Sequence, residues 1–170
     1  MALIIAVSLA LSAICFAGEP TVTITTKKPE LNQESKECGG FSEDSLVLTI
    51  KSKKAEITRE FCSSYGKADA KLIKDARGTY FLVLKTAIGR GTHVTTEYLT
   101  VYRIERSLEE LVRFPVYKPA GFFTNCYYDY EIEKPQNGGL LFLLTLRVED
   151  ASPKDAEWIP KVKKRTILIK

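Results

Sequence analysis

Apolar residues recur at every second position over most of this chain, in short segments that end at turn-forming residues. Residues 122–133 and 139–148 form the clearest pair, separated by a turn that contains Asn137 and Gly138. A period of two is typical of β-strands, and Asn-Gly is a strong signal for a tight hairpin turn. One face of the second segment carries Leu140, Phe142, Leu144 and Leu146. The pattern predicts an antiparallel hairpin.

Other segments share this strand character. They are residues 21–26, 45–50, 55–61, 79–88, 94–104 and 165–170. Residues 79–88 are apolar on both faces, which predicts a central strand covered on both sides. Gly89, Arg90 and Gly91 follow it and indicate a second hairpin turn.

A short helix is predicted where the strand pattern is interrupted. Ser107 and Glu110 fit a capping box at the start of residues 108–113, and Pro115 discourages continuation of a helix. Residues 27–37 and 150–163 are predicted to be loops. The fold class is therefore all-β, an antiparallel barrel or two-sheet sandwich of about eight or nine strands with one short helix.

The N-terminal segment predicts export. Of the 170 residues, the first 17 carry no charge and end in Cys15-Phe16-Ala17, which fits a signal peptide cleaved after Ala17. Residues 18–170 then form a single β-rich domain in the periplasm or outside the cell. No membrane span remains after cleavage. Retention of residues 1–17 as a membrane anchor is the alternative.

Export allows disulfide bonds, and three cysteines follow the cleavage site. Cys38 and Cys62 bracket two predicted strands and are expected to form a disulfide, with metal ligation as the alternative. Cys126 lies on a mostly apolar strand face, so we interpret it as a buried free thiol. The chain has no C-x-x-C motif, and His93 is its only histidine. We therefore expect neither a metal site nor a cofactor.

Motifs for catalysis are weak. His93 has no nucleophile signature near it, and no glycine-rich phosphate loop opens a helix, so we expect no catalytic residues. Glu97, Asp129 and Glu131 lie among aromatic residues, which leaves a carbohydrate-active enzyme as an alternative. The net charge is +4, with a cluster of Lys161, Lys163, Lys164 and Arg165. We interpret this cluster as a solvated face, with attraction to anionic envelope surfaces as the alternative, and expect no nucleic-acid partner.

The candidate partner-binding site is the turn of the second hairpin, which comprises Gly89, Arg90, Gly91, Thr92 and His93. Glycines permit a protruding turn with positive φ, and the planar guanidinium of Arg90 can pair with a carboxylate on a partner. The alternative is a plain turn with a solubilising charge.

Residues 75–104 combine an Asp-x-x-Gly turn at Asp75, an apolar strand, a Gly-x-Gly tip and an aromatic strand. This stretch resembles the hairpin of periplasmic inhibitors of invertebrate-type lysozyme, whose tip occupies the cleft of the enzyme. We therefore expect an exported, non-enzymatic β-domain that binds a protein or glycan of the cell envelope. A periplasmic lysozyme inhibitor is the alternative within the same class. The residues identify neither the partner nor the oligomeric state.

Overall fold

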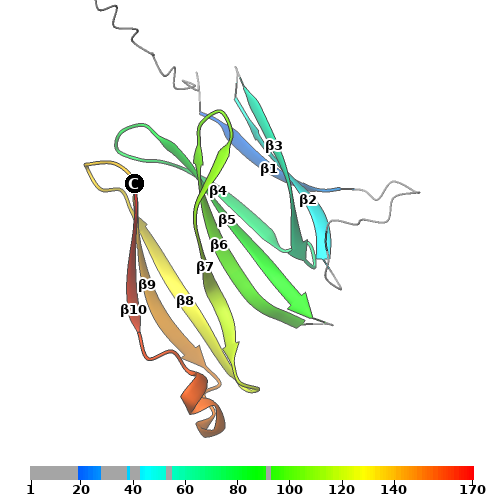
Figure 1. The fold of residues 1–170 in the computed structure, drawn as a ribbon, viewed down its shortest axis with the longest axis vertical. Coiled ribbons are helices and arrows are strands. Elements are labelled where there is room, and N and C mark those ends of the chain that lie inside the picture. The colour runs from blue at the N-terminus through cyan, green and yellow to red at the C-terminus, as the bar shows by residue number, and fades with distance from the viewer. Residues whose placement is uncertain (1–18, 28–37, 39–42, 53–54, 91–92) are drawn as a thin grey trace, which may run out of the picture.

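The computed structural model describes residues 19–27, 38, 43–52, 55–90 and 93–170. Within these ranges the chain forms ten strands and one 3₁₀ helix, in two antiparallel sheets (Figure 1). The all-β fold is therefore confirmed. The elements are β1 (Thr21–Thr26), β2 (Glu43–Lys51), β3 (Glu56–Ser64), β4 (Ala68–Lys74), β5 (Tyr80–Arg90), β6 (His93–Ile104), β7 (Leu108–Ala120), β8 (Thr124–Glu133), β9 (Leu140–Glu149), η1 (Pro153–Trp158) and β10 (Lys164–Ile169).

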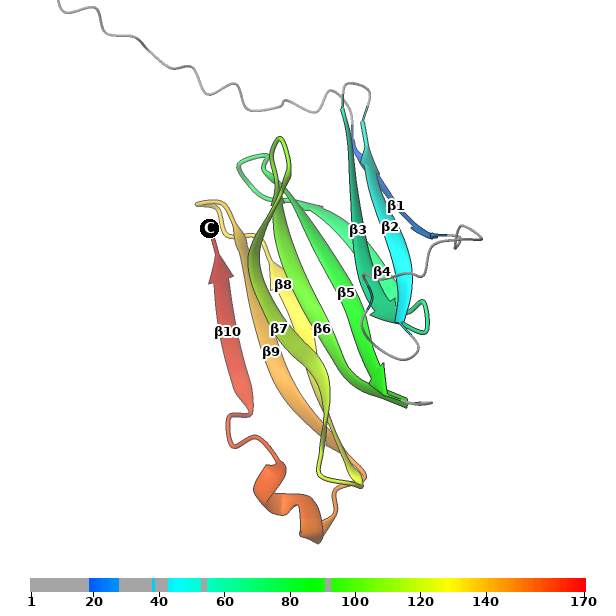
Figure 2. The same ribbon diagram turned by 45° about the vertical axis from the view of Figure 1, so that its right-hand side comes forward.

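The strands are arranged in three layers, although they belong to only two sheets. The smaller sheet has the order β1-β2-β3, and the larger has the order β10-β9-β8-β7-β6-β5-β4. The larger sheet folds over on itself, so that β8–β10 pack against one face of β4–β7. The smaller sheet covers the opposite face of β4–β7, as the two views in Figures 1 and 2 show. The fold is a sandwich in which β4–β7 form the middle layer.

Each interface between layers has its own apolar core. The core between the middle layer and β8–β10 contains Ile73, Phe81, Val83, Leu99, Val101, Phe114, Val116, Leu140, Phe142, Leu144 and Ile169. The core between the middle layer and β1–β3 contains Leu48, Ile50, Leu82, Leu84, Tyr102 and Ile104. Successive residues of one strand point to opposite faces, so β5 and β6 contribute alternately to both cores.

Strand β5 shows why residues 79–88 lack a polar face. Phe81 and Val83 belong to one core, while Leu82 and Leu84 belong to the other. The prediction of a strand covered on both sides is confirmed. The strand is central in the sense that it belongs to the middle layer. In the order of strands within its sheet it lies next to the edge strand β4.

The predicted helix over residues 108–113 is wrong, because these residues begin β7. Val101 pairs with Val112 and Tyr102 with Glu110, so Leu111 is an extra residue at a β-bulge. Leu108 packs in the core next to β1–β3, whereas Val112 packs in the other core. The bulge exchanges the two faces of the strand and so hides its period of two.

The C-terminal loop and the start of β8 also differ from the sequence prediction. Residues 153–158 of the predicted loop form η1, and residues 122 and 123 lie in the turn that precedes β8. No helix in the described ranges is long and apolar enough to cross a membrane. The predicted signal segment 1–17 and residues 28–37 of a predicted loop lie outside the described residues.

The turn at Asp75 joins two of the layers. The Asp75 carboxylate accepts hydrogen bonds from the backbone amides of Arg77 (2.9 Å) and Thr79 (2.8 Å) within its own turn. It also accepts one from Gly139 (2.7 Å), the residue before β9. Gly139 has a φ of +84°, and a Cβ there would lie 2.0 Å from the Ile169 carbonyl oxygen, so a side chain does not fit. This contact fixes the β4–β5 turn to the outer layer.

We expect Leu82→Ala and Leu144→Ala each to lower the free energy of unfolding by about 2 to 5 kcal/mol, because each removes a buried side chain from a different core. Urea denaturation measures the change. Leu168→Ala is the matched control, since Leu168 is 49% exposed and its loss is expected to change stability by no more than about 0.5 kcal/mol. Losses similar to that of the control at both core positions would contradict the assignment of these cores.

Candidate functional site

The tip of the β5–β6 hairpin projects beyond the end of β3 in both ribbon views (Figures 1 and 2). Gly89 pairs with Val94, and Arg90 pairs with His93. The predicted hairpin is thus confirmed, while Gly91 and Thr92 lie outside the described residues. His93 is exposed at the first position of β6. We call residues 89–93 the hairpin tip.

Three consecutive residues, the last two of β3 and the first of the turn after it, anchor the base of the hairpin tip. The Ser63 hydroxyl accepts a hydrogen bond from the Ala87 amide at 2.9 Å and itself donates to the Lys67 carbonyl oxygen. The Ser64 hydroxyl accepts from the Gly89 amide at 2.6 Å, and the Tyr65 hydroxyl donates to the His93 carbonyl oxygen at 3.2 Å. These contacts hold the base of the tip to the β3–β4 turn.

Gly89 is required by a close contact with Tyr65. It is not one of the glycines with positive φ, which is the property we expected of it from sequence. A Cβ at this position would lie 2.5 Å from a carbon of the Tyr65 ring, so the ring occupies the space of a side chain. Tyr65 itself has a φ of 58°, an uncommon conformation for a residue other than glycine.

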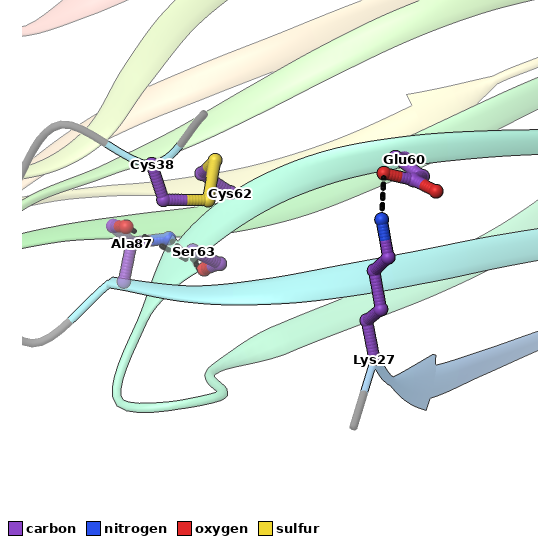
Figure 3. The surroundings of a disulfide bond; sticks show 6 residues. All are labelled: Lys27, Cys38, Glu60, Cys62, Ser63 and Ala87. Carbon is purple, nitrogen blue, oxygen red and sulfur yellow. Dashed lines mark hydrogen bonds and ion pairs between the residues drawn. A yellow bond between two sulfur atoms is a disulfide. The ribbon is translucent and has the colours of Figure 1, made fainter. Parts of the chain in front are cut away.

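The predicted disulfide is confirmed, since Cys38 and Cys62 are bonded across a sequence separation of 24 residues. Figure 3 shows it next to Ser63 and its partner Ala87, so the disulfide lies directly beside the anchor of the hairpin tip. On the same strand Glu60 pairs with Lys27 at 3.0 Å.

Cys126 is confirmed as a buried free thiol. Burial raises the pKa of this thiol, which leaves less of the reactive thiolate at neutral pH. Its side chain is only 3% exposed, so it is a core residue of β8.

We expect the double variant Cys38→Ser/Cys62→Ser to be less stable by about 3 kcal/mol, because the unfolded chain regains the entropy that a closed loop of this length removes. Denaturation of the oxidised wild type, the reduced wild type and the variant measures the change. Reduced wild type and variant are expected to agree. A variant as stable as the oxidised protein would contradict a stabilising role for the bond.

The three carboxylates of the enzymatic alternative lie on two strands, β6 and β8. Glu97 on β6 pairs with Lys85 on β5 at 2.5 Å, and Asp129 on β8 pairs with Arg147 on β9 at 2.8 Å. Glu131 is exposed on β8. Both paired carboxylates are thus held by a neighbouring cation, an arrangement that also occurs in ordinary surface ion pairs.

A small pocket opens between the middle layer and β8. Its volume is about 220 Å³, and its lining comprises Asp69, Lys71, Val83, Lys85, Leu99, Tyr130 and Ile132. It contains none of the three carboxylates singled out from sequence. In the described part of the chain, no group of three or more histidine, cysteine, aspartate or glutamate residues is placed to hold a metal ion.

A second surface was not expected from sequence. Among the residues that the structure describes, three aromatic side chains are largely exposed: Phe122 (95%) and Phe123 (62%) in the β7–β8 turn, and Trp158 (64%) in η1. Figures 1 and 2 both show η1 beside this turn, to one side of the hairpin tip. We call Phe122, Phe123 and Trp158 the aromatic end.

Asp155 joins the two parts of the aromatic end. Its carboxylate accepts hydrogen bonds from the amides of Phe122 (3.3 Å), Phe123 (2.9 Å) and Thr124 (3.0 Å). Gly121, before the turn, has a φ of +70°, and a Cβ there would lie 2.1 Å from an Asp155 carboxylate oxygen. The turn is therefore shaped around this one side chain.

Burial alone would raise the pKa of Asp155, but the hydrogen bonds donated by the Phe123, Thr124 and Phe122 amides lower it below the ordinary value of 3.8. A carboxyl group whose pKa is lower in the folded state stabilises the fold above its unfolded pKa. That stability is lost as the pH falls through the folded pKa.

We expect Asp155→Asn to lower the urea midpoint at pH 7, and the difference from wild type to shrink as the pH falls below about 4. The only tryptophan of the chain, Trp158, lies in the same helix as Asp155 and reports its unfolding by fluorescence. A difference of the same size at pH 7 and pH 3 would show that the ionised carboxylate is not what holds the turn.

Comparison of the chain with protein-family models, with curated proteins and with solved structures finds no match.

Proposed function

We propose that this protein is an exported, non-enzymatic domain that binds another macromolecule of the cell envelope, a protein or a glycan, through the hairpin tip. The anchoring of the tip by Ser63, Ser64 and Tyr65 supports the proposal most directly. A loop that is already held in place loses less conformational entropy when it binds, so more of the contact energy appears as affinity.

The disulfide supports the location we propose. Disulfides persist in oxidising compartments and are rare in the cytosol. The Cys38–Cys62 bond agrees with the uncharged N-terminal segment in favouring export. We therefore propose a periplasmic or secreted protein.

A lysozyme inhibitor is the more specific form of this proposal. The stretch that resembles those inhibitors, residues 75–104, spans the Asp75 turn and the complete strands β5 and β6. The pattern thus corresponds to one contiguous hairpin with a projecting tip, which supports the same mode of binding. The enzymatic alternative gains no comparable support from Glu97, Asp129 and Glu131.

We expect Arg90→Ala to weaken binding at the tip by roughly thirtyfold or more, corresponding to about 2 kcal/mol for a guanidinium at the centre of an interface. The thermal melt is expected to stay unchanged, since Gly89 and its contact with Tyr65 are retained. The measurement compares inhibition of an invertebrate-type lysozyme and recovery of cross-linked envelope components by wild type and variant.

Arg106→Ala is the matched control, because Arg106 is an exposed arginine in the turn at the far end of β6. Loss of recovery with Arg90→Ala alone supports the tip as the binding element. Equal recovery by all three proteins, with equal melts, would refute it. Recovery that depends on Arg90 without lysozyme inhibition would reject the inhibitor form and keep the general one.

A further inference from the structure

The aromatic end exposes large apolar side chains on a part of the fold that is held in place. Phe122 is 95% exposed, although its backbone amide is bound by Asp155. The Thr124 hydroxyl accepts a hydrogen bond from the Ser152 amide at 2.9 Å, which ties the segment before η1 to the start of β8. Exposed apolar side chains in such a braced turn are a sign of an interaction surface.

Trp158 belongs to the same surface. In a 3₁₀ helix residues three apart lie on the same face, so Trp158 follows Asp155 on the face that meets the β7–β8 turn. Val162, four residues further along, is also 53% exposed. The segment after η1 thus exposes one more apolar side chain.

Basic residues follow the apolar surface. Five cations lie between residues 153 and 165, namely Lys154, Lys161, Lys163, Lys164 and Arg165, and all are exposed. The same segment has one exposed carboxylate, Glu157, because Asp155 is buried and bound by backbone amides. Exposed Lys118 precedes the turn on β7. Glu149 and Asp150, at the end of β9, add two exposed carboxylates, but the six cations named still outnumber the three exposed carboxylates at this end of the molecule.

We propose that the aromatic end docks on the surface of an anionic phospholipid bilayer. Phe122, Phe123 and Trp158 enter the headgroup region, where aromatic rings partition well, and the lysines contact the lipid phosphates.

The kind of cation favours lipid over a protein partner. Four of the five cations between residues 153 and 165 are lysines, which are depleted in protein–protein interfaces, whereas arginine is enriched there. Attraction to an anionic surface requires only charge, and the long lysine stem lets the apolar part lie against the bilayer. The surface is also a projecting turn, which suits insertion between headgroups.

This proposal does not rest on the hairpin tip. The test uses the full chain and vesicles of phosphatidylcholine alone or with phosphatidylglycerol in a roughly 3:1 ratio. Trp158 is the only tryptophan, so a blue shift of its emission reports entry of this surface into the bilayer. We expect the shift with the anionic vesicles, and a decrease of binding as salt is raised.

Two sets of variants identify the residues responsible. We expect Phe122→Ser/Phe123→Ser to weaken vesicle binding by about tenfold or more, and neutralisation of Lys161, Lys163 and Lys164 to glutamine to weaken it about fivefold per charge. Leu168→Ser is the matched control, because Leu168 is 49% exposed near the opposite end of β10. It is expected to bind as wild type, as is Arg90→Ala, and thermal melts verify that each variant is folded.

All of these proteins carry the same N-terminal apolar segment, so differences between them arise at the substituted positions. Absence of a Trp158 shift with anionic vesicles would overturn the proposal. So would a shift that survives the loss of both phenylalanines. A shift that appears on raising the protein concentration without lipid would assign the surface to contact between two copies of the chain instead.

Discussion

The two-sided burial of the middle layer is the constraint on which the rest of the fold depends. Because β5 places Phe81 and Leu82 in different cores, neither face of this strand can be exposed to water without a large loss of apolar contact. The layer therefore needs a cover on each side. The chain supplies β1–β3 before it and β8–β10 after it, and the second cover is continuous with the middle layer through β7.

Two buried aspartates close the interface between the middle layer and the outer strands. Asp75 accepts amides from its own turn and from Gly139, while Asp155 accepts three amides from the β7–β8 turn. Hydrogen bonding to backbone amides satisfies a buried carboxylate without a cation. A glycine with positive φ lies at both places: Gly121 leaves space for the Asp155 carboxylate itself, whereas Gly139 leaves space for the Ile169 carbonyl oxygen.

The sequence predicts the strands whose period is uninterrupted and fails where the chain departs from it. The hairpin of β8 and β9 follows from the local alternation of apolar residues and its Asn-Gly turn. The disulfide follows from the expectation that the protein is exported to an oxidising compartment. Strand β7 does not, because the bulge at Leu111 breaks its alternation and Ser107-x-x-Glu110 imitates a helix start. Strand β4 is also missing from the sequence prediction, because it lies at the edge of the sheet and has few large apolar residues. Asp155 contacts a turn more than 30 residues away in the sequence, and such a contact leaves no local signal. The aromatic end therefore cannot be predicted from sequence. Its one sequence signal is the pair of adjacent phenylalanines at 122 and 123, since two neighbouring strand residues point to opposite faces.

Both proposed surfaces combine an exposed element with a rigid support, and in both the support lies on another part of the chain. The hairpin tip is held by the end of β3 beside the disulfide, and the aromatic end is held by η1 through Asp155. Polar contacts to the backbone fix the base of the hairpin tip and the β7–β8 turn, and at the turn they leave the side chains of Phe122 and Phe123 exposed. The hairpin tip comes after β5 and the β7–β8 turn comes after β7. Strands β5 and β7 run in the same direction, with β6 between them, so the two loops lie at the same end of the middle layer. A domain docked on a bilayer by the aromatic end would therefore hold the hairpin tip near the membrane surface, where the macromolecules of an envelope are concentrated.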